Sequence, residues 1–114
     1  LRDEGVLLVG SGHITHNLRA LFPVMRGGRQ PEPALVEQVN AFTGWFAEKF
    51  AAGDRDAILD WKRQAPFPAE NHPTDEHLMP IFFAYGAAGD APRVERAHAS
   101  KQLGFFAYDS YLFH

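Results

Sequence analysis

An apolar stripe with the period of a helix is the feature that most constrains the fold of this chain of 114 residues. Its members are large apolar residues, namely Leu35, Val39, Phe42, Phe46 and Phe50. Because they recur at spacings of four, three, four and four residues, they share one helix face. We predict a helix from about Pro33 to Ala52, ended by Gly53. Its phenylalanines are expected to pack in the core rather than to line a cofactor site.

A short apolar run lies near the start of the chain. Val6 to Val9 are apolar on both faces, which is typical of a fully buried strand in a parallel sheet. Gly10, Ser11 and Gly12 follow and indicate a tight turn. The chain is therefore expected to begin within a sheet.

A second, shorter helix is expected directly after the long one. Asp54 can cap its first turn, and Ile58 and Trp61 face the same way along it. We expect this helix to stop before Pro66, since the residue that precedes a proline disfavours helix.

A third helix is predicted at residues 78–86, which are apolar nearly all round and therefore expected to be buried on several sides. Thr74, Asp75 and Glu76 suit its N-terminus. Pro80 falls near its first turn, where a missing N–H costs little.

Loops and strands complete the expected organisation. Residues 22–33 and 66–73 each contain three prolines and are predicted to be loops. The end of the chain, residues 93–100 and 103–113, gives two candidate strands, the second rich in aromatic residues.

This order of elements predicts an α/β fold with a helix-covered mixed β-sheet. A chain of 114 residues, 46% of them hydrophobic, can form one core, so residues 1–114 are expected to be a single domain or part of one. Ligands of such sheets bind beyond the carboxyl ends of strands, which points to the turn at residues 10–18.

Charge and cysteine content narrow the expected partners. The formal net charge is −3 and the basic residues are scattered, so we expect neither nucleic acid nor a membrane surface as a partner. Apolar runs are far shorter than the roughly 20 residues of a membrane span. Without cysteine, a metal would be held by histidine and carboxylate, and a cytoplasmic protein that binds small molecules is expected.

Four of the six histidines fall in two short segments. His13 and His16 follow the predicted first strand, and His72 and His77 precede the predicted third helix. Imidazole transfers protons near neutral pH and also binds transition metals, so the residue types leave both roles open. A single histidine is more often a structural residue than a ligand, and Asp75 can simply complement a helix dipole.

The spacing of His13 and His16 is weak evidence for a metal site. His13 and His16 are three residues apart, as in a helical metal pair, but Gly10 and Gly12 make a regular helix before Asn17 doubtful.

Other familiar motifs are absent. His72 and His77 are five residues apart with a proline between them, unlike the two histidines of a HExxH helix. Ser11 lacks the surroundings of a nucleophile elbow, and the third glycine of a dinucleotide fingerprint is missing.

Three stretches together resemble a known family. They are GVLLVGSGHITHNL (residues 5–18), HPTDEHLMPIFFAYGAAG (72–89) and AYDSYLF (107–113). They are similar to the C-terminal half of the class III extradiol ring-cleavage dioxygenases, in the DOPA 4,5-dioxygenase-like branch, and the resemblance covers essentially the whole chain. It implies that residues 1–114 are the C-terminal part of one catalytic domain.

The resemblance implies roles for particular residues. His16 matches an active-site histidine, expected to act in acid–base catalysis, with direct metal contact as a second possibility. His77 matches a metal ligand, and His72 matches a pocket histidine near the substrate, which makes it a second catalytic candidate. Glu76 could orient His77 or bind metal itself, although adjacent side chains usually point in different directions.

The reaction implied is cleavage of a catechol, such as DOPA, by O₂ at non-haem Fe(II). Imidazole suits Fe(II), although Zn²⁺ binds the same atoms more tightly and can replace it in purified protein. Two alternatives remain: a metal-binding or interaction relative without oxygenase activity, and a zinc-dependent hydrolase.

Members of that family are longer, and further metal-binding histidines come from their N-terminal half. The resemblance therefore implies a missing half, in the same or a second chain, unless His13 or His72 completes the ligand set. We expect the isolated chain to bind iron weakly and to be inactive. Assembly into a homo-oligomer stays open.

Overall fold

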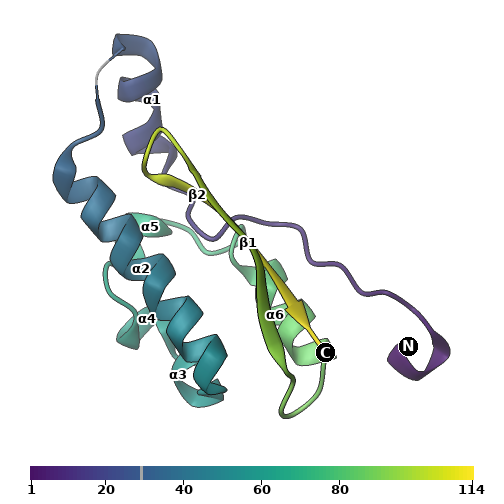
Figure 1. The fold of residues 1–114 in the computed structure, drawn as a ribbon. Helices are drawn as coiled ribbons and strands as arrows, with labels where there is room; N and C mark the ends of the chain where they lie inside the picture. Colours follow the sequence, from purple (N-terminus) through teal and green to yellow (C-terminus); the bar gives the residue numbers. More distant parts are fainter. Residues whose placement is uncertain (29) are drawn as a thin grey trace.

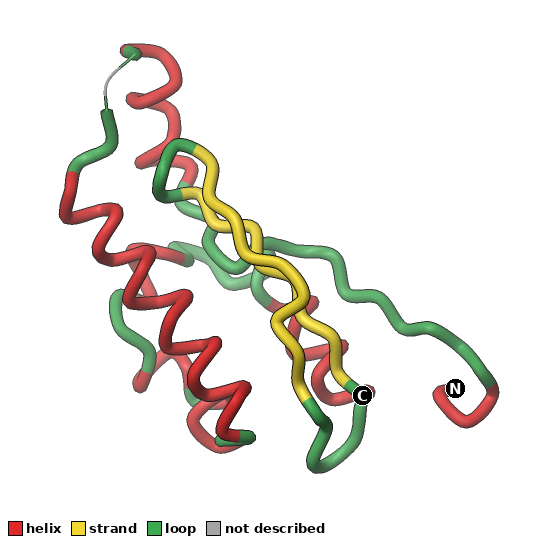
Figure 2. The backbone as a smooth tube through the Cα atoms, in the orientation of Figure 1, coloured by secondary structure: helices red, strands yellow, loops and turns green. Residues whose placement is uncertain are grey.

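A computed structural model describes residues 1–28 and 30–114 of the chain (Figures 1 and 2). Helices and a two-stranded antiparallel sheet make up this part of the chain, which confirms the predicted α/β class. In chain order the elements are η1 (Arg2–Glu4), α1 (Leu18–Gly27), α2 (Pro33–Ala52), α3 (Arg55–Leu59), α4 (Trp61–Gln64), α5 (Pro68–Asn71), α6 (Met79–Ala87), β1 (Val94–Gln102) and β2 (Phe106–Phe113).

Helix α2 has the predicted bounds and the predicted role. Gly53 ends it with a left-handed φ of 65°, a conformation that glycine adopts without strain. Phe42 and Phe46 are completely buried, so the apolar stripe does form the core. The spacing of apolar residues thus defined both the helix and its buried face.

Two short helices follow where one was predicted. The Asp54 side chain caps α3 as expected, because its Oδ1 accepts a hydrogen bond from the N–H of Ala57 at 3.2 Å. The helix is interrupted at Asp60, and α4 then ends before Pro66, as predicted. Ile58 and Trp61 are both buried against the α2 stripe.

The two terminal strands pair as an antiparallel hairpin that lies across the middle of the molecule (Figure 1). Leu103 and Gly104 turn the chain with φ angles of 53° and 78°. Helix α2 packs on the hairpin through Phe50, whose ring lies 5.0 Å from that of Tyr111 and 5.4 Å from that of Phe113. The hairpin is therefore anchored on one side by the core.

Val6 to Val9 do not form the predicted strand, and the described sheet has two antiparallel strands instead of the expected mixed set. No hydrogen bond joins the backbone of Leu7, Leu8 or Val9 to another segment of the described chain. The prediction relied on apolar side chains on both faces, a pattern that requires neighbours to cover those faces. Leu7, however, is 85% exposed.

Both predicted loops contain helices. Residues 18–27 form α1, with Pro23 inside it, because Asn17 caps the helix by accepting the N–H of Ala20 at 3.2 Å. The same predicted loop includes Arg29, which lies outside the described residues. Helix α5 occupies residues 68–71, with Pro68 in its first turn, where proline is tolerated.

Helix α6 differs from its prediction in two ways. It begins at Met79, and the side chains of Thr74 and Asp75 do not cap it, since Thr74 hydrogen-bonds Glu76. Within α6 only Tyr85 is buried, whereas Phe83 is 57% exposed. Pro80 does lie in the first turn, as predicted. Helix α6 is therefore less buried than its apolar sequence predicts.

No helix in the described part of the chain combines the length and the apolar character needed to cross a membrane.

Candidate active site

The two histidine segments, far apart in the sequence, meet where residues 10–16 cross the start of α6. Gly10 and Gly12 allow the crossing, because a Cβ at either position would overlap the carbonyl oxygen of Pro80 or of His77. The N–H of His13 donates to that carbonyl oxygen of His77 at 2.8 Å. Further along, the N–H of His16 donates to the carbonyl oxygen of Asn71 at 2.9 Å.

His16 and His77 form the centre of the candidate site. Their rings stack face to face, with centroids 3.5 Å apart and planes 10° apart. His13 stands beside the pair, its ring centroid 5.8 Å from that of His16 and 6.4 Å from that of His77. Helix α1 starts only at Leu18, so the helical spacing of His13 and His16 plays no part, as the glycines before them suggested.

Strand β2 adds an aromatic wall that the sequence did not identify as part of the site. The His13 ring lies 5.3 Å from Phe106 and 5.4 Å from Tyr108, and Phe106 is also 6.2 Å from His16. The aromatic enrichment of the last strand was the available signal, but it was interpreted as a strand preference only.

The surroundings of His16 favour its neutral form. Burial lowers its pKa, and the positive charge that His77 or His13 would carry lowers it further, while Glu76 opposes the shift. Burial, followed by the same repulsion from His77, also lowers the pKa of His13. At pH 7 both imidazoles are therefore available as proton acceptors.

Glu76 is the carboxylate nearest to the stacked pair in the described chain. Its Oε1 lies 3.3 Å from Nδ1 of His77, without the geometry of a hydrogen bond. A hydrogen bond from its own backbone N–H, then one from Thr74, lower the pKa of Glu76, so it is ionised at neutral pH. It adds negative charge next to His77.

His72 lies in the core behind the site. Its side chain is 4% exposed, and its Nε2 lies 2.9 Å from the carbonyl oxygen of Ile14. Its ring also lies 5.7 Å from Phe42 and 6.0 Å from Trp61. This contact fixes the turn that carries His13 and His16, and a catalytic role for His72 stays a prediction.

The candidate metal ligands do not by themselves form a metal site. Among the described residues, no three histidine, cysteine or carboxylate side chains are placed to hold one ion. The stacking of His16 on His77 sets ring faces together, whereas metal binding uses the nitrogens at the ring edges. The described chain thus offers ligand candidates without a complete ligand set.

Comparison with known proteins gives the family. The chain is 33% identical to 4,5-DOPA dioxygenase extradiol of Beta vulgaris over 113 residues, which are 99% of the chain, and 32% identical to that of Mirabilis jalapa over 114 residues. The protein of that name from Escherichia coli (strain K12) is 31% identical over 90 residues, or 76% of the chain. The chain therefore belongs to the class III extradiol dioxygenase family, in the branch of 4,5-DOPA dioxygenase. No protein-family model matches it.

The chain spans about 40% of the length of the Beta vulgaris and Mirabilis jalapa relatives. About 60% (100 − 40) of each relative therefore lies outside the matched region.

Proposed function

We propose that this chain supplies part of the active site of a non-haem iron-dependent extradiol dioxygenase, in which O₂ cleaves the ring of a DOPA-like catechol next to its two hydroxyl groups. The observation that carries the proposal is the stacked pair of His16 and His77 in a chain whose relatives are named 4,5-DOPA dioxygenase extradiol. The rest of the site would come from the part of the relatives outside the matched region, in the same or a second chain.

His16 is the proposed general base. Its lowered pKa keeps it neutral at pH 7, so it can accept the proton of a catechol hydroxyl. It can later return that proton to the ring-opened product, and no further reductant is needed because both oxygen atoms of O₂ enter that product.

The aromatic wall suits a flat substrate. Phe106 and Tyr108 lie beside His13, Phe106 also lies near His16, and aromatic rings favour offset or edge contacts with another ring. We propose that these side chains orient the catechol ring beside His16.

Fe(II) is the proposed metal, with His77 as a ligand and His16 as the secondary ligand candidate. Zn²⁺ would bind the same nitrogens but cannot change oxidation state. The remaining ligands would lie outside this chain, since the described residues do not complete a site. A cytoplasmic location, in keeping with the absence of cysteine, belongs to the same proposal.

The test uses a chimera in which this chain replaces the matched region of the Beta vulgaris relative. The chimera is reconstituted with Fe(II) without O₂, and formation of the yellow ring-opened product is then followed with DOPA and O₂. His16→Ala is expected to lower turnover about 10²- to 10⁴-fold with most iron retained, the usual range for loss of a general base. His77→Ala is expected to lose both iron and turnover.

His98→Ala is the matched control, because His98 lies exposed on β1 and outside the histidine cluster. Equal iron affinity in the His77→Ala chimera would refute the ligand assignment. Iron binding without product would favour a non-catalytic relative, and hydrolysis without O₂ would favour a zinc hydrolase.

A further inference from the structure

One edge of β2 carries backbone groups without partners. Arg93 and His114 exchange both backbone hydrogen bonds, at 3.1 and 2.9 Å, next to the last strand pair. Hydrogen-bonded and non-hydrogen-bonded residue pairs alternate along an antiparallel ladder. The backbone N–H and C=O groups of the odd-numbered residues of β2 therefore point away from β1. The N–H of Ala107 does so, since it donates to Oγ1 of Thr15 at 3.0 Å. By the same alternation the N–H of Tyr111 points away from β1, and it makes no backbone hydrogen bond to a described segment outside the hairpin.

The segment from Val6 to Ser11 presents a second unpartnered edge. The backbone groups of Leu7, Leu8 and Val9 make no hydrogen bond to other described residues, although the next turn is fixed to α6. Two of the three side chains are also uncovered, with Leu7 85% and Val9 72% exposed, while Leu8 is half-buried. Apolar residues on both faces and free backbone groups on both edges are the properties of a strand without neighbours.

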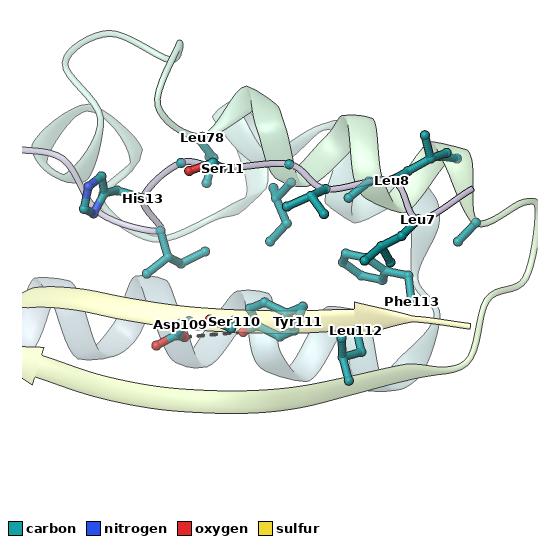
Figure 3. A pocket seen from close by; sticks show the side chains of 18 of the residues that line it. Leu7, Leu8, Ser11, His13, Leu78, Asp109, Ser110, Tyr111, Leu112 and Phe113 are labelled. Atoms are coloured by element: carbon teal, nitrogen blue, oxygen red, sulfur yellow. Dashed lines mark hydrogen bonds between the residues drawn. The ribbon is translucent and has the colours of Figure 1, made fainter. Parts of the chain in front are cut away.

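These two edges face each other across a slot. Figure 3 shows residues 6–13 and β2 running alongside in opposite directions, and the cavity between them has a volume of about 670 Å³. Helix α6 adds Ile81 and Ala84 to its apolar lining. His13 lies at one end of the slot, and His77 also lines it, so the slot opens onto the candidate active site.

We propose that an extended, mainly apolar segment from the part of the protein outside this chain inserts into the slot as a β-strand. It would pair with residues 6–11 on one edge and with β2 on the other. Because these two edges run in opposite directions, the inserted strand is parallel to one and antiparallel to the other. Insertion would complete a mixed sheet and bring one end of the new strand beside His13.

The shape and chemistry of the slot favour a strand over other occupants. A strand offers a row of N–H and C=O groups on each edge, which matches the unpartnered groups on both walls. A small apolar molecule could fill the volume but would leave those backbone groups unpaired. About 60% of each plant relative lies outside the matched region, so ample chain exists to supply the strand.

Amide hydrogen exchange tests the proposal without any activity measurement. In the isolated chain, the outward N–H groups of Tyr111 and Phe113 should exchange much faster than those of Ser110 and Leu112, which face β1. In the chimera, protection at Tyr111 and Phe113 should rise by about a hundredfold, because a new ladder covers them. Supplying the unmatched part of the relative as a co-expressed second chain repeats the measurement if the chimera does not fold.

Two lysine substitutions sharpen the test. Val9→Lys places a lysine on the edge segment itself, beside the side chains of the inserted strand, and lysine at a sheet edge is a means by which proteins block strand pairing, so it should abolish the added protection while leaving the isolated chain unchanged. Leu59→Lys, at a 57% exposed leucine of α3, should have no effect in either setting.

The proposal is overturned if Tyr111 and Phe113 gain no protection in either format, or if Val9→Lys leaves that protection intact. Protection that instead rises with the concentration of the isolated chain would assign the slot to a second copy. Loss of turnover with protection retained would contradict the proposed reaction and leave the inserted strand supported.

Discussion

The hairpin has two sides, and only one of them is fully covered. On the α2 side, Phe42 and Phe46 are completely buried and Phe50 joins the helix to β2. On the side of α6 and residues 6–11, Val9 and Phe83 stay largely exposed. Both sides are rich in apolar residues, so composition does not explain why the side chains are buried on one side and exposed on the other.

The difference lies in the partners that each side has. The stripe of α2 faces the hairpin and the short helices, all supplied by this chain. Residues 6–11 meet α6 on one side and an open slot on the other. An apolar segment whose cover lies elsewhere in the protein remains exposed until that cover is present.

Truncating one phenylalanine on each side should give the largest contrast. Phe46→Ala is expected to lower the free energy of unfolding by about 3–5 kcal/mol, since it opens a cavity in a closed core. Phe83→Ala, the matched change on α6, should cost less than about 1 kcal/mol because the ring is mostly in water. Chemical denaturation of the isolated chain measures both, and equal losses would contradict the two-sided description.

A pair of glycine substitutions tests the contact that holds residues 10–16 against the start of α6. Gly12→Ala should lower the free energy of unfolding by about 1–3 kcal/mol, because its Cβ meets the backbone carbonyl of His77, which cannot move aside cheaply. Gly44→Ala, in open space on α2, should raise it by up to about 1 kcal/mol through helix propensity. Thermal unfolding distinguishes the two, and a neutral Gly12→Ala would show that the crossing is loose.

The pH dependence of stability reports on His72, which joins the turn of the site to the α2 core. Burial lowers the pKa of His72 below its ordinary value of 6.5, and nearby His16 adds to the shift. As the pH falls below 6.5, the unfolded chain takes up a proton that the folded chain resists, so the free energy of unfolding falls. The slope from this one group can approach about 1.4 kcal/mol per pH unit, and it disappears above 6.5.

His72→Gln should reduce this slope and leave the part that comes from His13 and His16, whose pKa values burial also lowers, whereas His98→Gln, at an exposed histidine of β1, should leave the whole slope in place. Denaturant titrations between pH 5 and 8, a window chosen to bracket the ordinary histidine pKa, provide the measurement. An unchanged slope in His72→Gln would assign the pH dependence to other groups.

Local signals predicted the elements that this chain completes by itself. The period of Leu35 to Phe50 fixed α2, and the side chain of Asp54 capped the next helix as expected. The two strands expected at the end of the chain are also present, as β1 and β2, although their pairing as a hairpin was not predicted.

The same reasoning failed where the outcome depends on distant contacts. The strand expected at Val6 to Val9 needs neighbours that the described chain lacks. The helix at residues 18–27 is a different, local case: Pro23 alone predicts a loop, but the cap from Asn17 and the helix-forming residues around it outweigh one lost hydrogen bond.

The residues of the candidate site were predicted from the sequence, but their geometry was not. The sequence marked two separate pairs, His13 with His16 and His72 with His77, but the way the two segments meet depends on two glycines that let one segment cross α6. The stacking of His16 on His77 is a result of that crossing, and no spacing within either motif encodes it. Tyr108 joins the site only through the register of the hairpin.

The central claim is that this chain holds part of an extradiol site that other residues of the protein complete. The most direct measurement is the rate of DOPA ring opening by the Fe(II)-loaded chimera and by the isolated chain under the same O₂. We predict steady product formation by the chimera and none above background from the isolated chain. Ring opening by the isolated chain at a rate comparable with that of the chimera would contradict the account.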